Sequence, residues 1–413
     1  MRDYLKRLPP QTKNILILIK KLSREYGKKV YLVGGPVRDL LLGIKNLDLD
    51  IAIEAEEILD FAKALAKKLK AEFLYHEDFN TVSLNYKYGK LDLAMTRKEF
   101  YPYPGSLPKV SFGTIREDLL RRDFTINAMA VELGEEKLVD FFGGRNDLSK
   151  GLIRILHERS FLEDPTRILR AIRFKTRYDF KIEEHTLRLL KEAIKENFLN
   201  NVSRQRIFNE LILSLKEEKP LKQILAIEDM LGFGFLQPRI RLDFKVLGGI
   251  ENQYNWFIKK YSEKVRLWLI YLIGILDNLS SSNANSLIRF FPLKKEILRE
   301  LFIYLRKKND FHFLGKRNIS PYRIYSILNP LCLEAILFLK AKYIQKNFQK
   351  NLIDFLSSYR RVSLNISGED LKNLGIKPGP KYRQILEFLL KNKLNGKIKT
   401  LQDELNLVRE RFI

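Results

Sequence analysis

The chain has 413 residues, 45% of them hydrophobic, and a formal net charge of +25. This length indicates two to four domains with a sizeable core. The single cysteine, Cys332, excludes an internal disulfide framework, and the four histidines lack the spacing of a zinc site. No stretch has the character of a signal peptide or a transmembrane helix, so a cytoplasmic protein is expected.

The positive charge lies mainly in the C-terminal part. Residues 1–150 carry 26 Lys and Arg against 22 Asp and Glu, whereas residues 151–413 carry 49 against 28. Such an excess predicts a polyanionic partner, and nucleic acid is favoured over a membrane because no helix sets a wide apolar face opposite its lysines. The alternative is a lysine-rich surface that serves solubility or heat resistance, although acidic residues then usually increase as well.

In chain order, the N-terminal part predicts alternating helices and strands. Helices are expected at residues 11–27, 36–42 and 56–69, and strands at 29–33, 47–53, 71–76, 80–87 and 90–96. Tyr88 and Gly89 separate the last two strands, as in a β-hairpin. Residues 99–113 contain three prolines and two glycines and predict a long loop near the active edge of the sheet. We therefore expect a mixed sheet backed by helices.

Two glycines and two aspartates in GGPVRDLLLGIKNLDLDIAIE form the first candidate site. Gly34 and Gly35 follow an apolar strand and open a short helix, a turn that can cradle a triphosphate. Because side chains alternate along a strand, Asp48 and Asp50 project to the same side. Paired carboxylates repel each other unless a cation neutralises them, and magnesium prefers oxygen ligands. An isolated D-x-D is more often a solvent-facing edge, but the glycine pair upstream favours a metal-dependent nucleotidyl-transfer site.

On a later strand Asp92 lies between two leucines. It either supplies a third carboxylate to the metals, as phosphoryl-transfer sites often need, or is an unrelated polar position.

The segment REDLLRRDFTINAMAVEL contains the next candidates. Arg121, Arg122 and Asp123 are expected to begin a stretch whose apolar spacing is helical and then strand-like. Arginines beside a triphosphate stabilise the charge of departing pyrophosphate, and an aspartate can accept a hydrogen bond from a ribose hydroxyl. A basic exposed helix end is the structural alternative. The following LVDFFGGRNDLSKGLIRIL predicts two strands joined by a turn at Gly143 and Gly144.

A basic helix is expected next, in FLEDPTRILRAIRFKTRYDF, with Asp164 as its N-cap. Arg167, Arg170 and Arg173 recur every three residues and form a stripe, which is usually a solvated face. Because Glu163 and Asp164 precede the stripe, carboxylates and arginines lie together here, and this combination can also recognise the edge of a base. A carboxylate accepts from the exocyclic amine of cytosine or adenine, whereas uracil and guanine present a carbonyl there.

These motifs occur in a recognisable order: GGPVRD, DLD, RRDFTINAM, FFGGRNDL and EDPTRILRAIRF. Over roughly residues 28–210 the chain resembles class II tRNA nucleotidyltransferases, a group of CCA-adding enzymes, CC-adding and A-adding relatives and bacterial poly(A) polymerases. The segment ISGEDLKNLGIKPGPKYRQILEFLL is similar to the tail of the tRNA-adding members. The resemblance implies an α+β fold, with a polymerase-β-like nucleotidyltransferase head containing a mixed sheet, followed by an all-helical neck, body and tail.

The resemblance also implies a role for each matching residue. Asp48 and Asp50 would hold two Mg²⁺ ions, and Asp92 is the third candidate catalytic carboxylate. The nucleotide would be bound by Gly34, Gly35, Arg38, Arg121, Arg122 and Asn127, with Asp123 on the ribose. The base template would be Glu163, Asp164 and Arg167, with Arg170 supporting the nucleotide. Four domains are expected: head 1–150, neck 151–215, body 216–345 and tail 346–413.

The implied activity is template-independent addition of C and/or A to the 3′ end of tRNA from CTP and ATP. The basic helical part would bind the acceptor and TΨC arms, and the protein would be a monomer or a homodimer. The motifs leave open whether CCA, CC or only A is added, although the length of the loop at 97–113 favours CCA or A over CC alone.

Other function classes also fit parts of the sequence. A noncatalytic RNA-binding protein or chaperone would share the basic C-terminal part but would not need paired aspartates. A nucleotide-sensing regulator would bind ATP through the same head without extending RNA. A poly(A) polymerase would add many adenylates to unstructured RNA, and the tail similarity favours tRNA instead.

Overall fold

A computed structural model describes residues 5, 8–44, 49–77, 80–238 and 240–413. The chain divides into two compact units, each with its own core. The first comprises Met1–Leu211 and Leu225–Phe235, and the second comprises Ile212–Ile224 and Leu236–Ile413.

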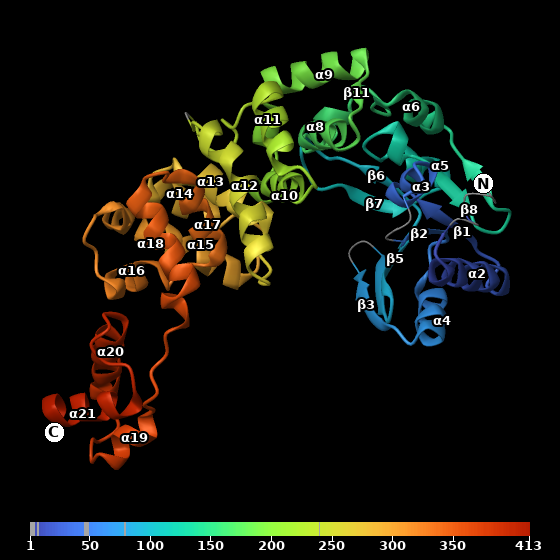
Figure 1. Ribbon diagram of the computed structural model, residues 1–413. Helices are drawn as coiled ribbons and strands as arrows, with labels where there is room; N and C mark the ends of the chain where they lie inside the picture. Colours follow the sequence, from blue (N-terminus) through green and yellow to red (C-terminus); the bar gives the residue numbers. More distant parts are fainter. Residues whose placement is uncertain (1–4, 6–7, 45–48, 78–79, 239) are drawn as a thin grey trace. The chain divides into compact units, whose positions relative to one another are not determined.

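The first unit is built on a seven-stranded sheet in the order β3-β4-β5-β2-β1-β8-β9 (Figure 1). Its strands are β1 Lys29–Val33, β2 Leu49–Glu54, β3 Glu72–His76, β4 Thr81–Tyr86, β5 Gly89–Met95, β8 Ala130–Glu132 and β9 Lys137–Val139. β2 and β5 are parallel, whereas the other neighbours pair antiparallel. The mixed sheet expected from the sequence is thereby confirmed, as is the β4–β5 hairpin.

Helices cover both faces of this sheet. The helices of the first unit are α2 Pro10–Glu25, α3 Gly35–Leu41, α4 Leu59–Leu69, α5 Ile115–Leu120, α6 Gly144–Lys150, α7 Ser160–Glu163, α8 Arg167–Tyr178 and α9 Glu184–Lys195. Two further helices, α10 Arg204–Leu215 and α11 Pro220–Met230, are shared between the units. α2 and α4 contact each other and the sheet (Figure 1). On the other face, Tyr31 and Ala52 pack against Ile115 and Leu119 of α5. Asp50 shares that second face with Ala52 because the two residues alternate with buried Ile51 on β2.

The segment 99–113 differs from its expected loop structure. β6 Arg97–Phe100 and β7 Lys109–Phe112 form an antiparallel two-stranded sheet. The three prolines all lie between the paired stretches, so none removes a hydrogen bond from the ladder. Proline content therefore marked only the connection, residues 101–108, and not the strands that flank it.

The expected turn at Gly143 and Gly144 also differs, because it opens helix α6. Gly143 has φ +74°, and the Asp140 carboxylate accepts hydrogen bonds from the Gly144 and Arg145 N–H groups at 2.8 and 2.9 Å. These bonds satisfy N–H groups at the start of a helix, which then runs to Lys150. A strand follows only at β10 Leu152–Ile153, which pairs in parallel with β11 Lys181–Ile182.

The second unit is helical in its described residues. Its helices are α12 Phe244–Lys260, α13 Leu267–Asp277, α14 Ser281–Ile288, α15 Lys295–Lys307, α16 Pro321–Leu328, α17 Leu333–Lys342, α18 Lys346–Ser357, α19 Gly368–Asn373, α20 Pro380–Leu394 and α21 Leu401–Phe412. α13 is apolar on all sides and packs against α12 and α17. Its buried Asp277 accepts hydrogen bonds from Tyr304 and from Lys342, so its charge is compensated.

The last three helices have their own apolar cluster, which includes Leu371, Ile385, Leu389 and Val408. α20 begins at Pro380, a residue type that suits the first turn of a helix.

Within the described part of the chain, no single helix is long and apolar enough to cross a membrane. One pair, Pro321–Leu328 and Leu333–Lys342, meets the length and composition test jointly and is bent by 114°.

Candidate nucleotide site

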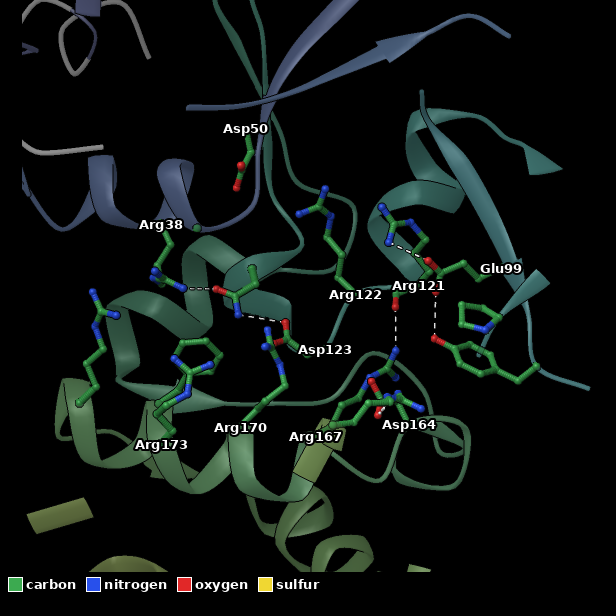
Figure 2. A pocket seen from close by; sticks show the side chains of 17 residues that line it. Arg38, Asp50, Glu99, Arg121, Arg122, Asp123, Asp164, Arg167, Arg170 and Arg173 are labelled. Atoms are coloured by element: carbon green, nitrogen blue, oxygen red, sulfur yellow. Dashed lines mark hydrogen bonds and ion pairs between the residues drawn. The ribbon is translucent and has the colours of Figure 1, made fainter. Parts of the chain in front are cut away.

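An arginine-rich cavity of about 540 Å³ lies in the first unit (Figure 2). Its basic lining residues are Arg38, Arg121, Arg122, Arg167, Arg170, Arg173, Arg177 and Arg206. Its acidic lining residues are Asp50, Glu99, Asp123 and Asp164. Figure 2 shows the labelled side chains gathered around a common space with Asp50 at one side of it. A cavity with this excess of guanidinium groups suits a polyphosphate.

Asp50 enters the cavity from β2, and Asp92 lies next to it on β5. The two are direct partners in the parallel register of these strands. Asp92 accepts hydrogen bonds from the Ser83 hydroxyl at 2.6 Å and from Lys90 Nζ at 2.7 Å. Asp48, the other member of the predicted metal pair, lies outside the described residues. The structure thus brings two carboxylates together on neighbouring strands, which is an oxygen donor set that suits a divalent cation.

The turn at Gly34 and Gly35 lies close against the guanidinium of Arg122. Gly34 has φ +74°, and a Cβ atom there would lie 2.3 Å from Arg122 Nη1. A side chain at this position would therefore displace a guanidinium that lines the cavity. Gly35 lines the cavity, whereas Gly34 does not. The Gly34 N–H donates to the Met129 carbonyl at 3.0 Å, so Gly34 is important as the residue that lets Arg122 approach.

We expect Gly34→Ala to weaken ATP binding by about tenfold or more, because the new methyl group displaces Arg122. Gly43→Ala is the matched control: Gly43 also has φ +79°, but a Cβ atom there would meet nothing within 4 Å. Gly43→Ala should cost about 1 kcal/mol of stability from backbone strain and leave ATP affinity unchanged. Titration of each variant with ATP, together with a thermal melt, separates the two effects. Equal ATP affinities in the two variants would contradict the role of Arg122.

A chain of polar contacts crosses the cavity from α3 to α10. The buried Arg38 donates to the Asn127 side-chain carbonyl, and Asn127 Nδ2 donates to Asp123 Oδ1 at 2.9 Å. Arg170 donates to Asp123 Oδ2 through Nε at 2.9 Å and Nη2 at 2.6 Å, and its Nη1 donates to Glu210 at 3.1 Å. Four predicted site residues, Arg38, Asp123, Asn127 and Arg170, are thus joined in one network.

Asp123 is ionised and fully engaged in this network. Burial acts to raise the pKa of its carboxyl, but the Arg170 guanidinium and the Asn127 hydrogen bond lower that pKa to about 2. Its Oδ1 also accepts from the Phe124 N–H at 2.8 Å. A ribose hydroxyl that bound here would therefore share an oxygen that already has a protein partner. The ribose contact stays a prediction, whereas the positioning of Asn127 and Arg170 is visible in the structure.

Arg121 and Arg122 follow the C-terminal end of α5 and do not begin a helix as expected. Thr114 and Glu117 form a capping box that starts this helix at Ile115, six residues before Arg121. Both arginines donate to the buried Asp118, at 2.8 and 3.0 Å. Burial acts to raise the pKa of Asp118, but the charges of Arg122 and Arg121 hold it below its usual value. The arginines are thereby held in place along the wall of the cavity.

The predicted base template is only partly assembled at the cavity. Asp164 and Arg167 line it, whereas Glu163 is not among the lining residues. Glu163 lies instead beside His157, at 3.5 Å, and Arg159, at 3.8 Å. The role of Glu163 in base recognition therefore stays a prediction without a cavity contact.

The arginine stripe of α8 is not a solvated face. Arg167 and Arg173 are buried, and Arg167 donates to the Ser160 hydroxyl at 2.6 Å and to the Arg121 carbonyl at 2.7 Å. Arg173 donates to Glu210 at 3.2 Å. The interpretation of this stripe as a solvated face is therefore wrong, because residues from distant segments bury its arginines.

Sequence reasoning missed several residues of the cavity. Arg206 on α10 donates to the carbonyls of Gly105 and Ser106, at 2.8 and 3.4 Å, and to Asp164 Oδ1 at 2.9 Å. Glu210 lies four residues later, one turn along the same helix. The signal that could have found both residues is their i, i+4 spacing in SRQRIFNEL. Glu99, Tyr101 and Arg177 are further lining residues without a sequence signal.

Comparison with known proteins identifies a matching family and several relatives of this chain. The poly(A) polymerase head domain family matches residues 30–154. An A-adding tRNA nucleotidyltransferase from Halalkalibacterium halodurans is 33% identical over 97% of this chain and 93% of its own length. Another from Geobacter sulfurreducens is 36% identical over 97% of this chain but only 47% of its own length, so the chain spans about half of that relative. A relative from Aquifex aeolicus is likewise matched over 45% of its length.

Solved structures extend the similarity to three dimensions. An apo form of a CCA-adding enzyme matches with a TM-score of 0.76 and 34% identity, covering 98% of this chain and 97% of that one. A Thermotoga maritima CCA-adding enzyme complexed with tRNA matches with a TM-score of 0.72 and 31% identity over 100% and 98% of the two chains. With its sheet, its arginine-lined cavity and these relatives along nearly its whole length, the chain belongs to the class II tRNA nucleotidyltransferase family.

Proposed function

We propose that this protein transfers a nucleotide from ATP to the 3′ end of tRNA. If it adds the whole CCA sequence, it also transfers nucleotides from CTP. The observation that carries the proposal is the cavity itself, with eight arginines around it, Asp50 at one side and the Asp164–Arg167 pair in its lining. Related structures are described as complexes with ATP, CTP and tRNA.

Membership of this family implies use of a divalent metal, and we propose that the metal is Mg²⁺. Asp50 would hold it, with Asp48 as the second predicted ligand, and Asp92 is the register partner of Asp50 on β5. Carboxylate oxygens on adjacent strands fit such an ion. When bound, it would supply charge neutralisation at the reacting phosphate and a lower pKa for the attacking hydroxyl.

The arginines of the chain would orient the triphosphate. Arg38 is held by Asn127, and Arg121 and Arg122 are held by Asp118, so the three guanidinium groups are positioned before the nucleotide binds. In the reaction the RNA 3′-oxygen forms a bond to the α-phosphorus and the bond from that phosphorus to pyrophosphate breaks. The hydroxyl proton passes to solvent, and the products are an RNA longer by one nucleotide and free pyrophosphate.

Base selection would depend on Asp164 and Arg167. Adenine at C6 and cytosine at C4 carry an exocyclic amine that can donate to a carboxylate. Guanine at C6 and uracil at C4 carry a carbonyl instead, which would leave a carboxylate at that position unpaired. Asp164 accepts from Thr166 and from Arg206, which fixes the direction of its carboxylate.

Addition of the final A is the specificity that we favour. Three relatives matched over 89–97% of this chain are named A-adding enzymes. Full CCA addition is the second candidate, because the matching apo structure and the tRNA complex are CCA-adding enzymes.

Primer extension tests the function and separates these candidates. Three tRNA transcripts, ending before CCA, after CC or after CCA, are incubated with Mg²⁺ and ATP, CTP or both, and the products are resolved at single-nucleotide length. Addition of one A to only the CC-ended transcript identifies an A-adding enzyme, and three residues on the shortest transcript identify a CCA-adding enzyme. No extension of any transcript would contradict the proposal and favour a nucleotide sensor or a noncatalytic RNA-binding protein.

We expect Arg206→Ala to reduce selection of ATP over GTP by about tenfold, because Asp164 loses a charged hydrogen-bond partner that aims it. Single-nucleotide extension of CC-ended tRNA with each nucleotide gives the ratio of kcat/KM values. Arg188→Ala, on the exposed side of α9, is the matched control and should leave the ratio unchanged. A lower rate with an unaltered ratio would assign Arg206 to stability alone.

Other parts of the expectation stay proposals. These are the four-domain division at 150, 215 and 345, binding of the acceptor and TΨC arms by the basic helices, a monomeric or homodimeric state, and a cytoplasmic location.

A further inference from the structure

Two aromatic side chains near the C-terminal end of α8 lie against Arg38 of α3. The guanidinium carbon of Arg38 is 5.3 Å from the centre of the Phe174 ring and 4.9 Å from the centre of the Tyr178 ring. The two rings are stacked, with their centres 6.2 Å apart and 19° between their planes. A cation is attracted to the electron-rich face of an aromatic ring, most strongly where water is excluded, and Arg38 is buried. Residues of α8 therefore help to hold an arginine that α3 contributes to the cavity.

The hydroxyl group of Tyr178 makes a further contact with α3. It donates to Asp39 Oδ1 at 3.1 Å, and Arg38 Nε donates to the same oxygen at 2.8 Å. Burial raises the pKa of Tyr178 to about 12, although the nearby charge of Arg38 acts to lower it. The hydroxyl therefore keeps its proton at neutral pH and donates it to the carboxylate that also holds Arg38.

The three guanidinium nitrogens of Arg38 have different surroundings. Nε donates to Asp39, and Nη1 donates to the Asn127 side-chain carbonyl. Nη2 lies toward the turn at Gly35, because a Cβ atom built on this glycine would be 3.4 Å from it. Among the described residues none accepts a hydrogen bond from Nη2. Nη2 is therefore the nitrogen that remains for a phosphate oxygen, and its direction depends on the contacts of Nε and Nη1.

Tyr178 lies outside the lining of the cavity, as does Asp39, whereas Arg38 and Phe174 belong to the lining. Tyr178 would therefore act on a bound nucleotide through Arg38. It is the last residue of α8, and Arg167, a member of the predicted base template, is the first. One helix thus carries a predicted base contact at its start and a support for a phosphate-binding arginine at its end.

We propose that Tyr178 is a positioning residue for the triphosphate: its hydroxyl fixes Asp39, its ring supports the guanidinium of Arg38, and both contacts direct Arg38 Nη2 toward a phosphate oxygen. The proposal rests on the proposed function, because it names a residue outside the cavity that fixes one of its phosphate contacts. A change in the placement of α8 would then alter triphosphate binding together with base contacts.

Tyr178→Phe tests the hydroxyl alone, because the ring and its contact with Arg38 are kept. We expect the Kd for ATP to rise by about threefold to tenfold and the Kd for inorganic triphosphate to rise by the same factor. The affinity for adenosine, measured by competition, should stay within about twofold, because adenosine lacks the phosphates that Arg38 would bind. An unchanged Kd for ATP, or an equal loss of adenosine affinity, would overturn the proposal.

Tyr322→Phe is the matched control for the loss of a hydroxyl group. Tyr322 also donates to a carboxylate, that of Glu387, at 2.7 Å, but it lies in the second unit and outside the lining of the cavity. Tyr322→Phe should change none of the three affinities. The same loss of ATP affinity in both variants would contradict a specific role of Tyr178.

Arg38→Ala shows whether Tyr178 acts through Arg38. In the Arg38→Ala background, Tyr178→Phe should cause no further loss of affinity for ATP or inorganic triphosphate, because the group that it positions is gone. A loss as large as the one in the wild-type background would overturn the proposal.

Primer extension by the wild-type protein separates this proposal from the proposed function. If Tyr178→Phe weakens binding of inorganic triphosphate as expected but the wild-type protein extends no transcript, the proposed catalytic function fails while the positioning role stands. Extension by the wild-type protein with an unchanged ATP affinity in Tyr178→Phe would overturn the positioning role alone.

Discussion

Asp50→Ala is expected to abolish nucleotide addition while leaving the fold intact. Asp50 lines the arginine-rich cavity, and its exposed carboxylate forms no part of the buried core of β2. Loss of residues that merely orient metal ligands costs about 10–100-fold, so loss of a ligand should cost more than about 100-fold. Single-turnover extension of CC-ended tRNA with ATP measures the effect.

Two companion variants sharpen this test. Asp60→Ala removes an exposed aspartate from α4, in the same unit but outside the lining of the cavity, and should retain full activity. Asp48→Ala should match Asp50→Ala if both aspartates hold the metals. Full activity in Asp50→Ala would contradict the metal assignment.

Asp123→Asn is expected to cause the largest loss of stability. Asp123 is buried and holds Arg170 through two hydrogen bonds. Its neutralisation leaves a largely buried guanidinium that still donates to Glu210. Breaking a buried pair costs about 3–5 kcal/mol, and we expect the lower end because Glu210 remains. The melting temperature of the first unit should fall by about 6–12 °C.

A double-mutant cycle and a pH series make this prediction specific. Asp123→Asn combined with Arg170→Gln should lower the free energy of unfolding by less than the sum of the two single changes, because the second change removes the unpaired charge. The pKa of Asp123 is lowered to about 2. The ionised carboxylate therefore adds to the free energy of unfolding above its ordinary pKa of about 3.9, and this stabilisation is lost as pH falls toward 2. The stability gap between wild type and Asp123→Asn should therefore be constant from pH 5 to 8 and narrow below about pH 4. A gap that persists unchanged at pH 2.5 would contradict the ion-pair account.

The sequence predicted those parts of the fold that depend on local pattern. Alternation in LDLDIAIE places Ile51 and Ile53 in the core and Asp50 on the opposite face, because side chains of a strand alternate. Residues 99–113 were misassigned because β6 and β7 are stabilised by pairing with each other, which composition does not reveal. Helix α6 was missed because its start depends on the Asp140 cap.

The candidate site was predictable as a set of residues but not as a network. Arg170 and Asp123 are 47 residues apart, and Arg170 and Glu210 are 40 apart, so no local spacing shows that the three meet. For the same reason the stripe on α8 resembled a solvated face. The resemblance to known enzymes supplied the functional residues, whereas the contact of Arg206 with Asp164 emerged only from the three-dimensional arrangement.

The most direct test of nucleotidyl transfer measures both products of one reaction. CC-ended tRNA, Mg²⁺ and ATP are mixed with the protein, and extended RNA and released pyrophosphate are quantified over the same time course. We predict one pyrophosphate for each added adenylate, with both products absent for Asp50→Ala. ATP binding without either product would contradict the central claim.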